Sequence, residues 1–257
     1  MWNKVFSESL TKNLFLNFMG GDKGFSVLVT NQITDYQTLF NNKSIPLYFV
    51  GENNIFENSA DCIENIRDSI LLDFQKHYSD NSITKLSIFY YIYALLNSKD
   101  YQEIYKADLM KESPRIMYVK DFWVYAETGE KLVKLHVNYE NIEPYEATIE
   151  FKNAAPSYEV IKMKYAKKGD KSAIIYNSDI TIKDIPEKAQ RYVLNGRTPM
   201  EWVMDQYVYE VKKNSQILFD PNQYSTDEKY ILNLLLKVIN VSIQTIDLID
   251  NLPTLEI

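Results

Sequence analysis

Five lysines fall within a short stretch in the second half of the chain. They are Lys162, Lys164, Lys167, Lys168 and Lys171. Ammonium groups so close in sequence repel one another, so their concentration favours an anionic partner over a role in stability. The phosphates of a nucleic acid are such a partner, because a lysine that neutralises a phosphate releases a counterion. A solvated basic surface without a partner is the alternative interpretation.

The net charge of the chain conceals this concentration. The formal net charge is −7. Residues 1–159 hold 15 Lys and Arg against 22 Asp and Glu, residues 160–213 hold 11 against 7, and residues 214–257 hold 2 against 6. Of the three segments, only residues 160–213 have a net positive charge, and they also contain Arg191 and Arg197. Because screening limits such interactions to about 10 Å, a local basic surface can meet phosphates on an acidic chain.

Residue patterns typical of catalysis are absent from the sequence. One cysteine, Cys62, and two histidines, His77 and His136, are too few for the usual structural zinc site. The glycine-rich segment Met19–Gly24 lacks the spacing of a phosphate-binding loop and is interpreted as a turn. Neither a nucleophile elbow nor the Asn/Asp-Pro-Pro-aromatic motif of amino-methyltransferases occurs. We therefore expect no active site, no metal and no cofactor in this chain.

Hydrophobic spacing predicts which elements position the lysines. Short apolar runs at residues 25–30 and 45–50 predict strands. Spacing of three and four residues then predicts helices at about 60–78, 82–96, 99–111 and 121–137. From about residue 145 the period becomes two, which predicts strands at 146–151, 158–166, 172–176 and 180–182.

The strand alternation places the lysines on a β-hairpin. Within residues 158–166, Lys162 and Lys164 fall on one face, and Ile161, Met163 and Tyr165 fall on the other. The turn Lys167–Lys171 joins this strand to the next and carries three lysines at its tip. The expected site is therefore one strand face together with the adjoining turn.

Two capping boxes predict the last helices. Thr198–Glu201, with Pro199 at the first helical position, predicts a helix through about Tyr207. Ser225–Glu228 predicts the longest helix, which ends near residue 250. The predicted fold is α+β, with a mainly helical N-terminal half, a mixed β-sheet with hairpins in the C-terminal half and a long C-terminal helix. Three parts are expected: short strands in 1–58, a helical subdomain in 59–144 and a β-rich subdomain in 145–257.

Several of these segments together resemble one protein family. The matching segments, in chain order, are Phe89–Ile116, Val160–Tyr165, Ile174–Asn177, Ile180–Pro186, Tyr192–Tyr207, Val238–Thr245 and Leu252–Pro253. The most specific of them is Tyr192–Tyr207, which contains Asn-Gly-Arg-Thr-Pro-Met-Glu-Trp. Across about residues 25–253 the chain resembles the C-terminal specificity, or target-recognition, region of Type ISP restriction-modification enzymes and related large helicase-like proteins.

The resemblance implies a function for the chain and a context for it. In that family, one bacterial polypeptide joins a nuclease, an ATP-driven translocase, an adenine-N6 methyltransferase and a target-recognition domain. This chain resembles the last part, so the resemblance implies a non-catalytic module in the cytoplasm. Residues 1–58 would include the junction that follows the methyltransferase. The implied partners are duplex DNA and the other domains of the parent, and no membrane partner is expected.

The expected DNA-binding residues are the five lysines together with Arg191, Arg197 and Arg115. Asn, Gln and Arg side chains on nearby loops would read base edges, because they form bidentate contacts to adenine and guanine. A structural domain that docks on the methyltransferase or translocase without reading bases is the alternative, and the acidic helical half, residues 60–150, favours it. An independent enzyme of unrecognised type is a third possibility.

Overall fold

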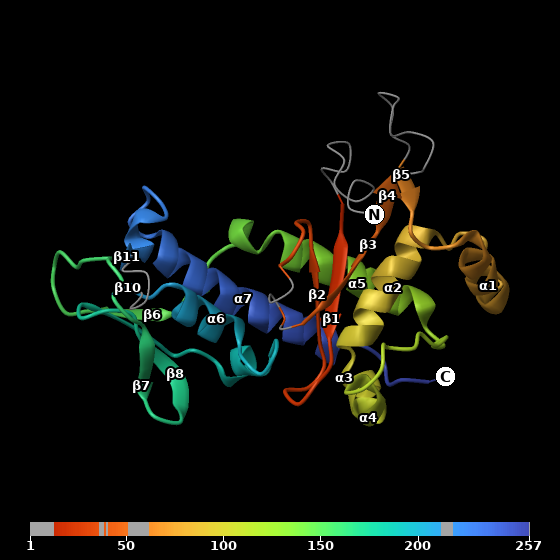
Figure 1. Cartoon of the computed structure of the whole chain (residues 1–257). Coiled ribbons are helices and arrows are strands. Elements are labelled where there is room, and N and C mark those ends of the chain that lie inside the picture. The colour runs from red at the N-terminus through yellow and green to blue at the C-terminus, as the bar shows by residue number, and fades with distance from the viewer. Residues whose placement is uncertain (1–12, 36–38, 40, 51–61, 212–217, 257) are drawn as a thin grey trace. The chain divides into compact units, whose positions relative to one another are not determined.

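The chain forms two compact units, which are described separately. A computed structural model describes residues 13–35, 39, 41–50, 62–211 and 218–256. The first unit comprises Met1–Val137 together with Leu248–Ile257, and the second comprises Asn138–Asp247 (Figure 1). The early strands and the first-half helices thus share one unit, whereas the sequence analysis places them in separate parts. The α+β class, with a mainly helical first half and a long C-terminal helix, is confirmed.

The first unit combines antiparallel strands with helices. Its elements are β1 (Phe15–Met19), β2 (Ser26–Thr30), β3 (Lys43–Pro46), β4 (Tyr48–Val50), β5 (Cys62–Glu64), α1 (Asp68–Tyr78), α2 (Lys85–Asn97), α3 (Lys99–Ile104), α4 (Lys106–Leu109) and α5 (Phe122–Val137). The strands form a sheet in the order β2-β1-β3 and a separate β4–β5 pair. Helix α2 begins at a capping box of Thr84 and Ser87, and it packs against α5.

A glycine in α5 permits the close packing of α2 and α5. A Cβ atom at Gly129 would lie 1.8 Å from the carbonyl oxygen of Tyr90 on α2. Any other residue at this position would therefore push the two helices apart. Glycine in the middle of a helix is unfavourable, because its intrinsic helix propensity is low. The close approach of α2 to α5 explains why a glycine is found at this position.

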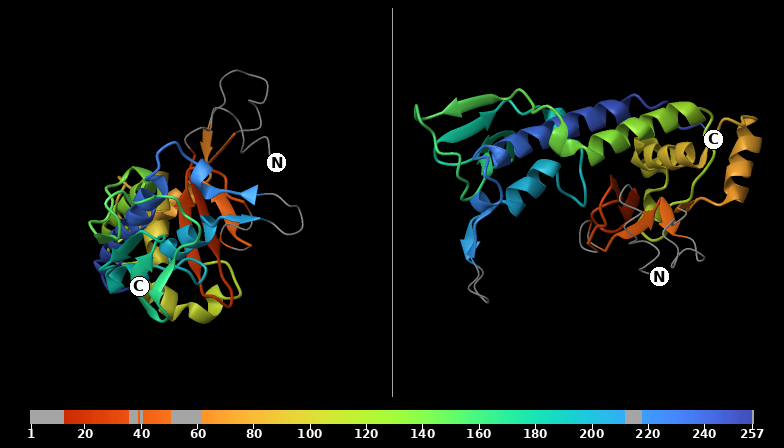
Figure 2. Two further views of the ribbon diagram at one scale, coloured as in Figure 1. Left: turned by 90° about the vertical axis from the view of Figure 1, so that its left-hand side faces the viewer. Right: turned by 90° about the horizontal axis from the view of Figure 1, so that it is seen from above.

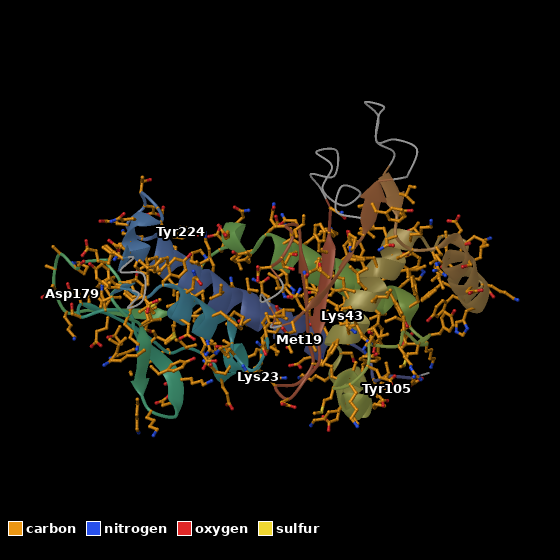
Figure 3. The ribbon with its side chains drawn as sticks, in the orientation of Figure 1. Met19, Lys23, Lys43, Tyr105, Asp179 and Tyr224 are labelled. Carbon is orange, nitrogen blue, oxygen red and sulfur yellow. The ribbon has the colours of Figure 1, made fainter. Side chains whose placement is uncertain are left out.

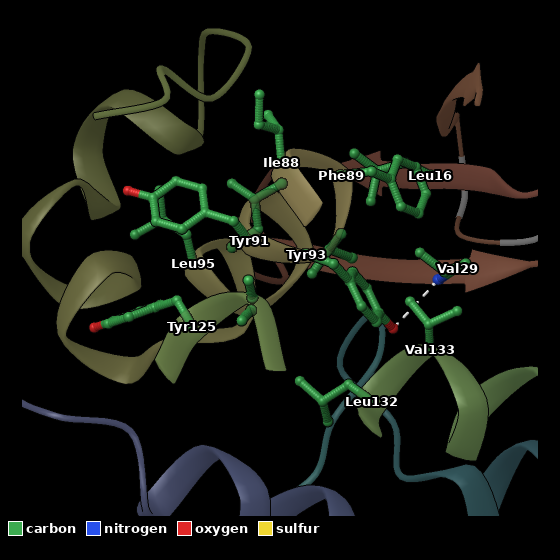
Figure 4. Close-up of a cluster of buried hydrophobic side chains, with 14 of the residues drawn as sticks. Leu16, Val29, Ile88, Phe89, Tyr91, Tyr93, Leu95, Tyr125, Leu132 and Val133 are labelled. Atoms are coloured by element: carbon green, nitrogen blue, oxygen red, sulfur yellow. Dashed lines mark hydrogen bonds between the residues drawn. The ribbon is translucent and has the colours of Figure 1, made fainter. Parts of the chain in front are cut away.

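Buried tyrosines join α2 to the rest of the first unit. The Tyr93 hydroxyl accepts a hydrogen bond from the N–H of Val29 at 3.2 Å and lies 2.5 Å from Nδ1 of His136 (Figure 4). Strand β2 lies at the edge of its sheet, so this hydroxyl satisfies a backbone group that no neighbouring strand among the described residues reaches. Burial raises the pKa of Tyr93 and lowers the pKa of His136 to about 3, so the imidazole is neutral.

The first predicted helix begins later than the hydrophobic spacing suggests. Residues 62–64 form β5, and α1 starts at Asp68, so the expected start near residue 60 is wrong. Ile63 pairs with Phe49 across the β4–β5 strands, which removes it from the helical face. Within α1 only Phe74 is buried, where it packs on the aromatic rings of Tyr91 and Phe122.

The second unit combines a four-stranded antiparallel sheet with helices. Its elements are η4 (Tyr139–Asn141), β6 (Thr148–Phe151), β7 (Lys164–Lys167), β8 (Asp170–Ile175), β9 (Ile180–Lys183), η5 (Glu187–Gln190), α6 (Pro199–Gln206), β10 (Glu210–Val211), β11 (Leu218–Phe219), η6 (Pro221–Gln223) and α7 (Tyr230–Asp250). The sheet order is β6-β9-β8-β7, and β10 pairs with β11. Helix α7 enters the first unit only at its last turn.

The core of the second unit lies between its sheet, α6 and α7. Ile174 and Ile182 pair across β8 and β9, and both are fully buried. Met200 of α6 and Leu235 of α7 belong to the same apolar cluster. The sheet, α6 and α7 therefore depend on one another for burial, and together they support the lysine-bearing hairpin.

Helix α7 starts at Tyr230. The predicted capping box, with Ser225 as its N-cap, would start the helix four residues earlier. The Ser225 hydroxyl accepts from the N–H of Asp227, and the Asp227 carboxylate accepts from the N–H of Lys229, so these residues form turns before Tyr230. By length and composition alone α7 would be long enough and apolar enough to cross a membrane, but 61% of its apolar window is buried inside the protein. Such burial is typical of a core helix.

Candidate nucleic-acid interface

Strands β7 and β8 form the basic hairpin. Lys167 pairs with Asp170, so Lys168 and Gly169 make a two-residue turn. Gly169 has a φ of 82°, a conformation that favours glycine. The Asp170 carboxylate accepts from the hydroxyl and the N–H of Ser172, and these hydrogen bonds lower the pKa of Asp170. The predicted hairpin is therefore present, with Lys167 and Lys168 at its tip.

The strand before this turn is shorter than predicted. Residues 158–163 lie outside β7, and the backbone groups of Glu159 and Val160 bind side chains in place of a neighbouring strand. The Asn222 side chain accepts from the N–H of Val160 at 2.7 Å and donates to its carbonyl at 3.1 Å. Asn177 donates to the carbonyls of Ser157 and Glu159. The expectation that Lys162 and Lys164 share one strand face is therefore wrong.

Exposure still alternates through the basic segment. Lys162 and Lys164 are exposed, and Met163 between them is buried. Ile161, which the sequence alternation places on the same face as Met163, is 70% exposed. Lys162, Lys164, Lys167 and Lys168 are thus exposed cations, and within the described part of the chain no ion pair of theirs is found. These four lysines are available to an external anion.

Lys171 differs from the other four lysines because it has an intramolecular partner. Its ammonium group lies 2.7 Å from Oε1 of Glu201 and 5.7 Å from the ring centre of Tyr165. Burial alone would raise the pKa of Glu201, but hydrogen bonds from Lys171 and the N–H of Thr198 bring it below its usual value. Glu201 also completes the predicted capping box of α6 with Thr198, which is confirmed. Lys171 therefore contributes to the junction between the hairpin and α6.

Arg197 likewise has partners within the second unit. Its guanidinium forms an ion pair with Asp205 and lies 5.5 Å from the ring centre of Trp202. Asn195 and Gly196 both have positive φ values, 50° and 75°, in the tight turn that precedes Arg197. The most family-specific segment of the sequence thus builds a turn and a helix start. Arg191 is exposed and follows η5.

Arg115 belongs to the first unit. Its side chain is 86% exposed and lies 3.0 Å from Oε2 of Glu112. Its carbonyl accepts a hydrogen bond from the Tyr101 hydroxyl at 2.9 Å. The structure therefore gives Arg115 a local partner within the first unit.

The sequence analysis missed a second hairpin beside the basic segment. Val211 of β10 pairs with Leu218 of β11, and the N–H of Tyr209 donates to the carbonyl of Ile161 at 2.9 Å. Seen from above in Figure 2, this hairpin extends away from α6 and α7 of its own unit. The available signal was a pair of short runs rich in aromatic and branched residues, 207–211 and 217–219, on either side of a polar stretch.

Ligand sets for metals are absent from the described residues, where no cluster of His, Cys, Asp or Glu could hold a metal ion. His136 is buried with Tyr93, and His77 stacks on Tyr118 with ring centres 4.2 Å apart.

Tyr224 is a large exposed side chain of the second unit (Figure 3), and its ring stacks on that of Tyr230. The chemistry that this arrangement supports is contact with an anion, through the exposed lysines of the hairpin and of the segment before it.

Comparison with known proteins relates the chain to enzymes that act on DNA. The family described as the Type ISP C-terminal specificity domain matches residues 2–234. A DNA complex of the Type ISP restriction-modification enzyme LlaGI, in a nuclease-deletion form, is similar over 99% of this chain, with 37% identity and a TM-score of 0.82. The ATP-dependent Type ISP enzyme LlaBIII bound to DNA is similar over 100% of it, with 38% identity and a TM-score of 0.88.

A complex of DrdV with DNA is also similar over 100% of this chain, with 27% identity and a TM-score of 0.85. This chain spans 22% of the LlaGI chain, 17% of the LlaBIII chain and 26% of the DrdV chain. No curated protein matches it. The similarity therefore extends over almost all of this chain and over a minor part of each of the three proteins.

Proposed function

This chain belongs to the Type ISP C-terminal specificity domain family, and from that premise we propose that it is the DNA target-recognition module of a larger restriction-modification polypeptide. It binds duplex DNA and directs adenine methylation and cleavage by other domains of that polypeptide. The observation that carries the proposal is similarity over 99% and 100% of the chain to two Type ISP enzymes in DNA complexes. The family is one of specificity domains, so catalysis is assigned to the parent.

The basic hairpin is the proposed phosphate-binding element. Lys162, Lys164, Lys167 and Lys168 are exposed and have no ion pair among the residues that the structure describes. Lys171 and Arg197 form ion pairs with Glu201 and Asp205. Exposed ion pairs contribute little energy, so both residues could bind phosphates instead. Each would have to give up its carboxylate partner to do so. We therefore rank the four exposed lysines first, and Arg191, Lys171, Arg197 and Arg115 after them.

The context of the module is a bacterial, cytoplasmic enzyme. A single cysteine, Cys62, suits a reducing compartment, since one cysteine cannot form an internal disulfide. The chain spans at most 26% of each of the three DNA-bound proteins, which supports a longer parent polypeptide, and we propose that this parent carries a methyltransferase and a translocase. Residues 1–58 would then include the junction after the methyltransferase.

Docking on another domain is the second candidate function. It is favoured by an apolar cavity of about 340 Å³ in the first unit, lined in part by Phe18, Ile45, Phe89 and Ile116. Ile45 and Ile116 are 44% and 38% exposed. A domain that only docked would still be needed for the parent's activity, but it would not change which DNA sequence is bound.

Substitution of the hairpin lysines tests the proposed function. We expect Lys167→Ala with Lys168→Ala, made in the polypeptide that carries the chain, to weaken binding to cognate and random duplexes by similar factors. Removal of each phosphate contact should reduce the slope of log affinity against log salt by about 0.9. Binding is measured by fluorescence anisotropy at several salt concentrations, and the melting temperature should stay nearly unchanged.

A matched control removes the same charge from the first unit. Lys111 and Lys131 are also exposed, and Lys111→Ala with Lys131→Ala should leave the salt slope unchanged. If the hairpin variant keeps both its affinity and its slope, the hairpin is only a solvated surface. If it loses affinity for the cognate duplex alone, the lysines read sequence, and the assignment to phosphates is wrong.

A further inference from the structure

Lys162 differs from the other three exposed lysines in what holds its backbone. Lys164 and Lys167 belong to β7, and Lys168 lies in the turn to β8, so strand pairing fixes all three. Lys162 lies two residues before β7 and belongs to no strand. Its ammonium group has a defined position only if other groups bind the backbone beside it, since a free segment samples many conformations.

Asn222 binds that backbone two residues before Lys162. Its Oδ1 atom accepts from the N–H of Val160 at 2.7 Å, and its Nδ2 atom donates to the carbonyl of Val160 at 3.1 Å. These are the two hydrogen bonds that a residue of a neighbouring antiparallel strand would make. The side chains of Val160 and Met163 are both buried. Lys162 therefore projects from a short span that is anchored on either side.

The Asn222 side chain is itself held in one orientation. The Asp220 carboxylate accepts from the N–H of Asn222 at 3.0 Å and from its Nδ2 atom at 2.9 Å. The Nδ2 atom thus donates to Asp220 and Val160 together, which directs Oδ1 to the N–H of Val160. Asn177 holds the preceding residues, because its side chain donates to the carbonyls of Ser157 and Glu159 at 2.7 and 2.9 Å.

We propose that Asn222 is a positioning residue of the DNA interface, which holds the backbone at Val160 so that the Lys162 ammonium group meets a phosphate. The inference rests on the proposed function and adds to it an uncharged residue that acts through Lys162. A lysine on a free segment loses backbone freedom when it binds, and this cost lowers the affinity. A segment that is already ordered in the free protein avoids that cost.

A purely structural role for Asn222 is the alternative, because Val160 belongs to the core of the second unit. The two roles differ in whether Asn222 and Lys162 affect DNA binding independently. A residue that acts through Lys162 has no effect on binding once that lysine is removed, whereas a structural residue acts alike in both backgrounds. Lys168 provides the comparison, since strand pairing on either side of its turn holds it without Asn222.

A double-mutant cycle in the polypeptide that carries the chain tests the proposal. Affinity for a labelled random-sequence duplex is measured by fluorescence anisotropy. We expect Asn222→Ala to lower the affinity about fivefold, which corresponds to the backbone freedom of one residue. Lys162→Ala should lower it at least as much. The variant with both changes should bind within about twofold of Lys162→Ala alone. Combined with Lys168→Ala, in contrast, the effect of Asn222→Ala should be undiminished.

Asn240→Ala is the matched control. Asn240 is a half-buried asparagine of the same unit, and its Nδ2 atom donates to the carbonyl of Glu143 at 2.8 Å. The change removes a similar bond from side chain to backbone, away from Lys162 in sequence, and the affinity should equal that of the wild type. Circular dichroism and the melting temperature establish that each variant is folded.

Asn177→Ala takes the place of Asn222→Ala if the latter does not fold. It loosens residues 157–159 from the other side, so it should lower the affinity less than fivefold, and only while Lys162 is present. An affinity equal to that of the wild type, or an equal loss with and without Lys162, would then overturn the inference.

The outcomes separate this inference from the proposed function. A wild type that binds no duplex overturns the proposed function and this inference with it. A wild type that binds overturns the inference alone in any of three cases: Lys162→Ala leaves the affinity unchanged, folded Asn222→Ala leaves it unchanged, or Asn222→Ala weakens binding equally with and without Lys162. Loss of affinity that depends on Lys162 and not on Lys168 supports the inference.

Discussion

The buried tyrosines of the first unit and the hairpin lysines of the second unit differ in where their polar groups are directed. In the first unit, tyrosine hydroxyls are directed inward: those of Tyr91, Tyr101 and Tyr125 donate to the backbone carbonyls of Met117, Arg115 and Pro253. In the second unit, four lysines are directed outward. The first arrangement satisfies buried backbone groups, whereas the second leaves groups available to a partner.

This difference separates stability from binding. A buried hydroxyl that joins loops to helices contributes to folding, because its loss leaves backbone groups without a partner. An exposed lysine with no ion pair contributes little to folding, so its loss should be visible only when DNA is present. Substitutions in the first unit should therefore change the free energy of unfolding, and those of the hairpin lysines should change affinity.

The largest effect is expected from Gly129→Ala. A Cβ atom there would lie 1.8 Å from the carbonyl oxygen of Tyr90, so α2 and α5 must separate. We expect a loss of about 3 kcal/mol of unfolding free energy or more, measured by urea denaturation. Gly169→Ala in the second unit is the control, since nothing lies within 4 Å of its Cβ position and only its φ of 82° is unfavourable. A loss at Gly129 no greater than that at Gly169 would contradict the prediction.

The next effect is expected from Tyr93→Phe. This change removes the hydroxyl that accepts from the Val29 N–H and lies beside His136, and it should destabilise the chain by about 2 kcal/mol. Tyr165→Phe in the second unit removes a hydroxyl that is 3.3 Å from Glu201 at a half-buried site, and a smaller loss is expected. Denaturant midpoints of the two variants give the comparison. Equal losses would show that burial does not distinguish the two hydroxyls.

A pH dependence of about 1 kcal/mol is expected from His136. Its folded pKa is lowered to about 3, below the ordinary value of 6.5, because burial disfavours the charged ring. The unfolded state therefore binds the proton first, so stability is full above pH 6.5 and falls as the pH is lowered toward 3. Unfolding free energies at pH 7.0 and 5.5 should differ by this amount, and His136→Gln should flatten the difference. If the variant shows the same difference in unfolding free energy between pH 7.0 and 5.5 as the wild type, His136 is not the cause.

The smallest effect on stability is expected from Lys168→Ala. Lys168 is an exposed turn residue, so its removal should change the unfolding free energy by less than about 0.5 kcal/mol. Lys171→Ala should destabilise slightly more, because it removes the contact with Glu201 at 2.7 Å. Thermal melting of both variants makes the measurement. A larger loss for Lys168 than for Lys171 would mean that Lys168 has a structural role.

Local signals in the sequence predicted many elements of the fold. The capping box of Thr198 and Glu201 was correctly predicted, because both partners of a cap lie within one helical turn of each other. The change to a period of two after residue 145 identified the region of β6 to β9. Where a competing interaction came from elsewhere in the chain, the prediction failed. The strand expected at 158–166 lacks residues 158–163, and Asn222 binds the backbone there from 62 residues away.

By itself the sequence determined the class of fold, the start of α6, a turn within Lys167–Lys171, and the concentration of positive charge in residues 160–213. These properties depend on neighbouring residues or on composition. Tertiary structure alone decided that Lys171 reaches Glu201 while the four other lysines stay without an ion pair in the described residues. It also decided that Val211 and Leu218 are exposed beside Ile161. Such pairings depend on which distant segments the core brings together, and no local pattern of residues encodes that.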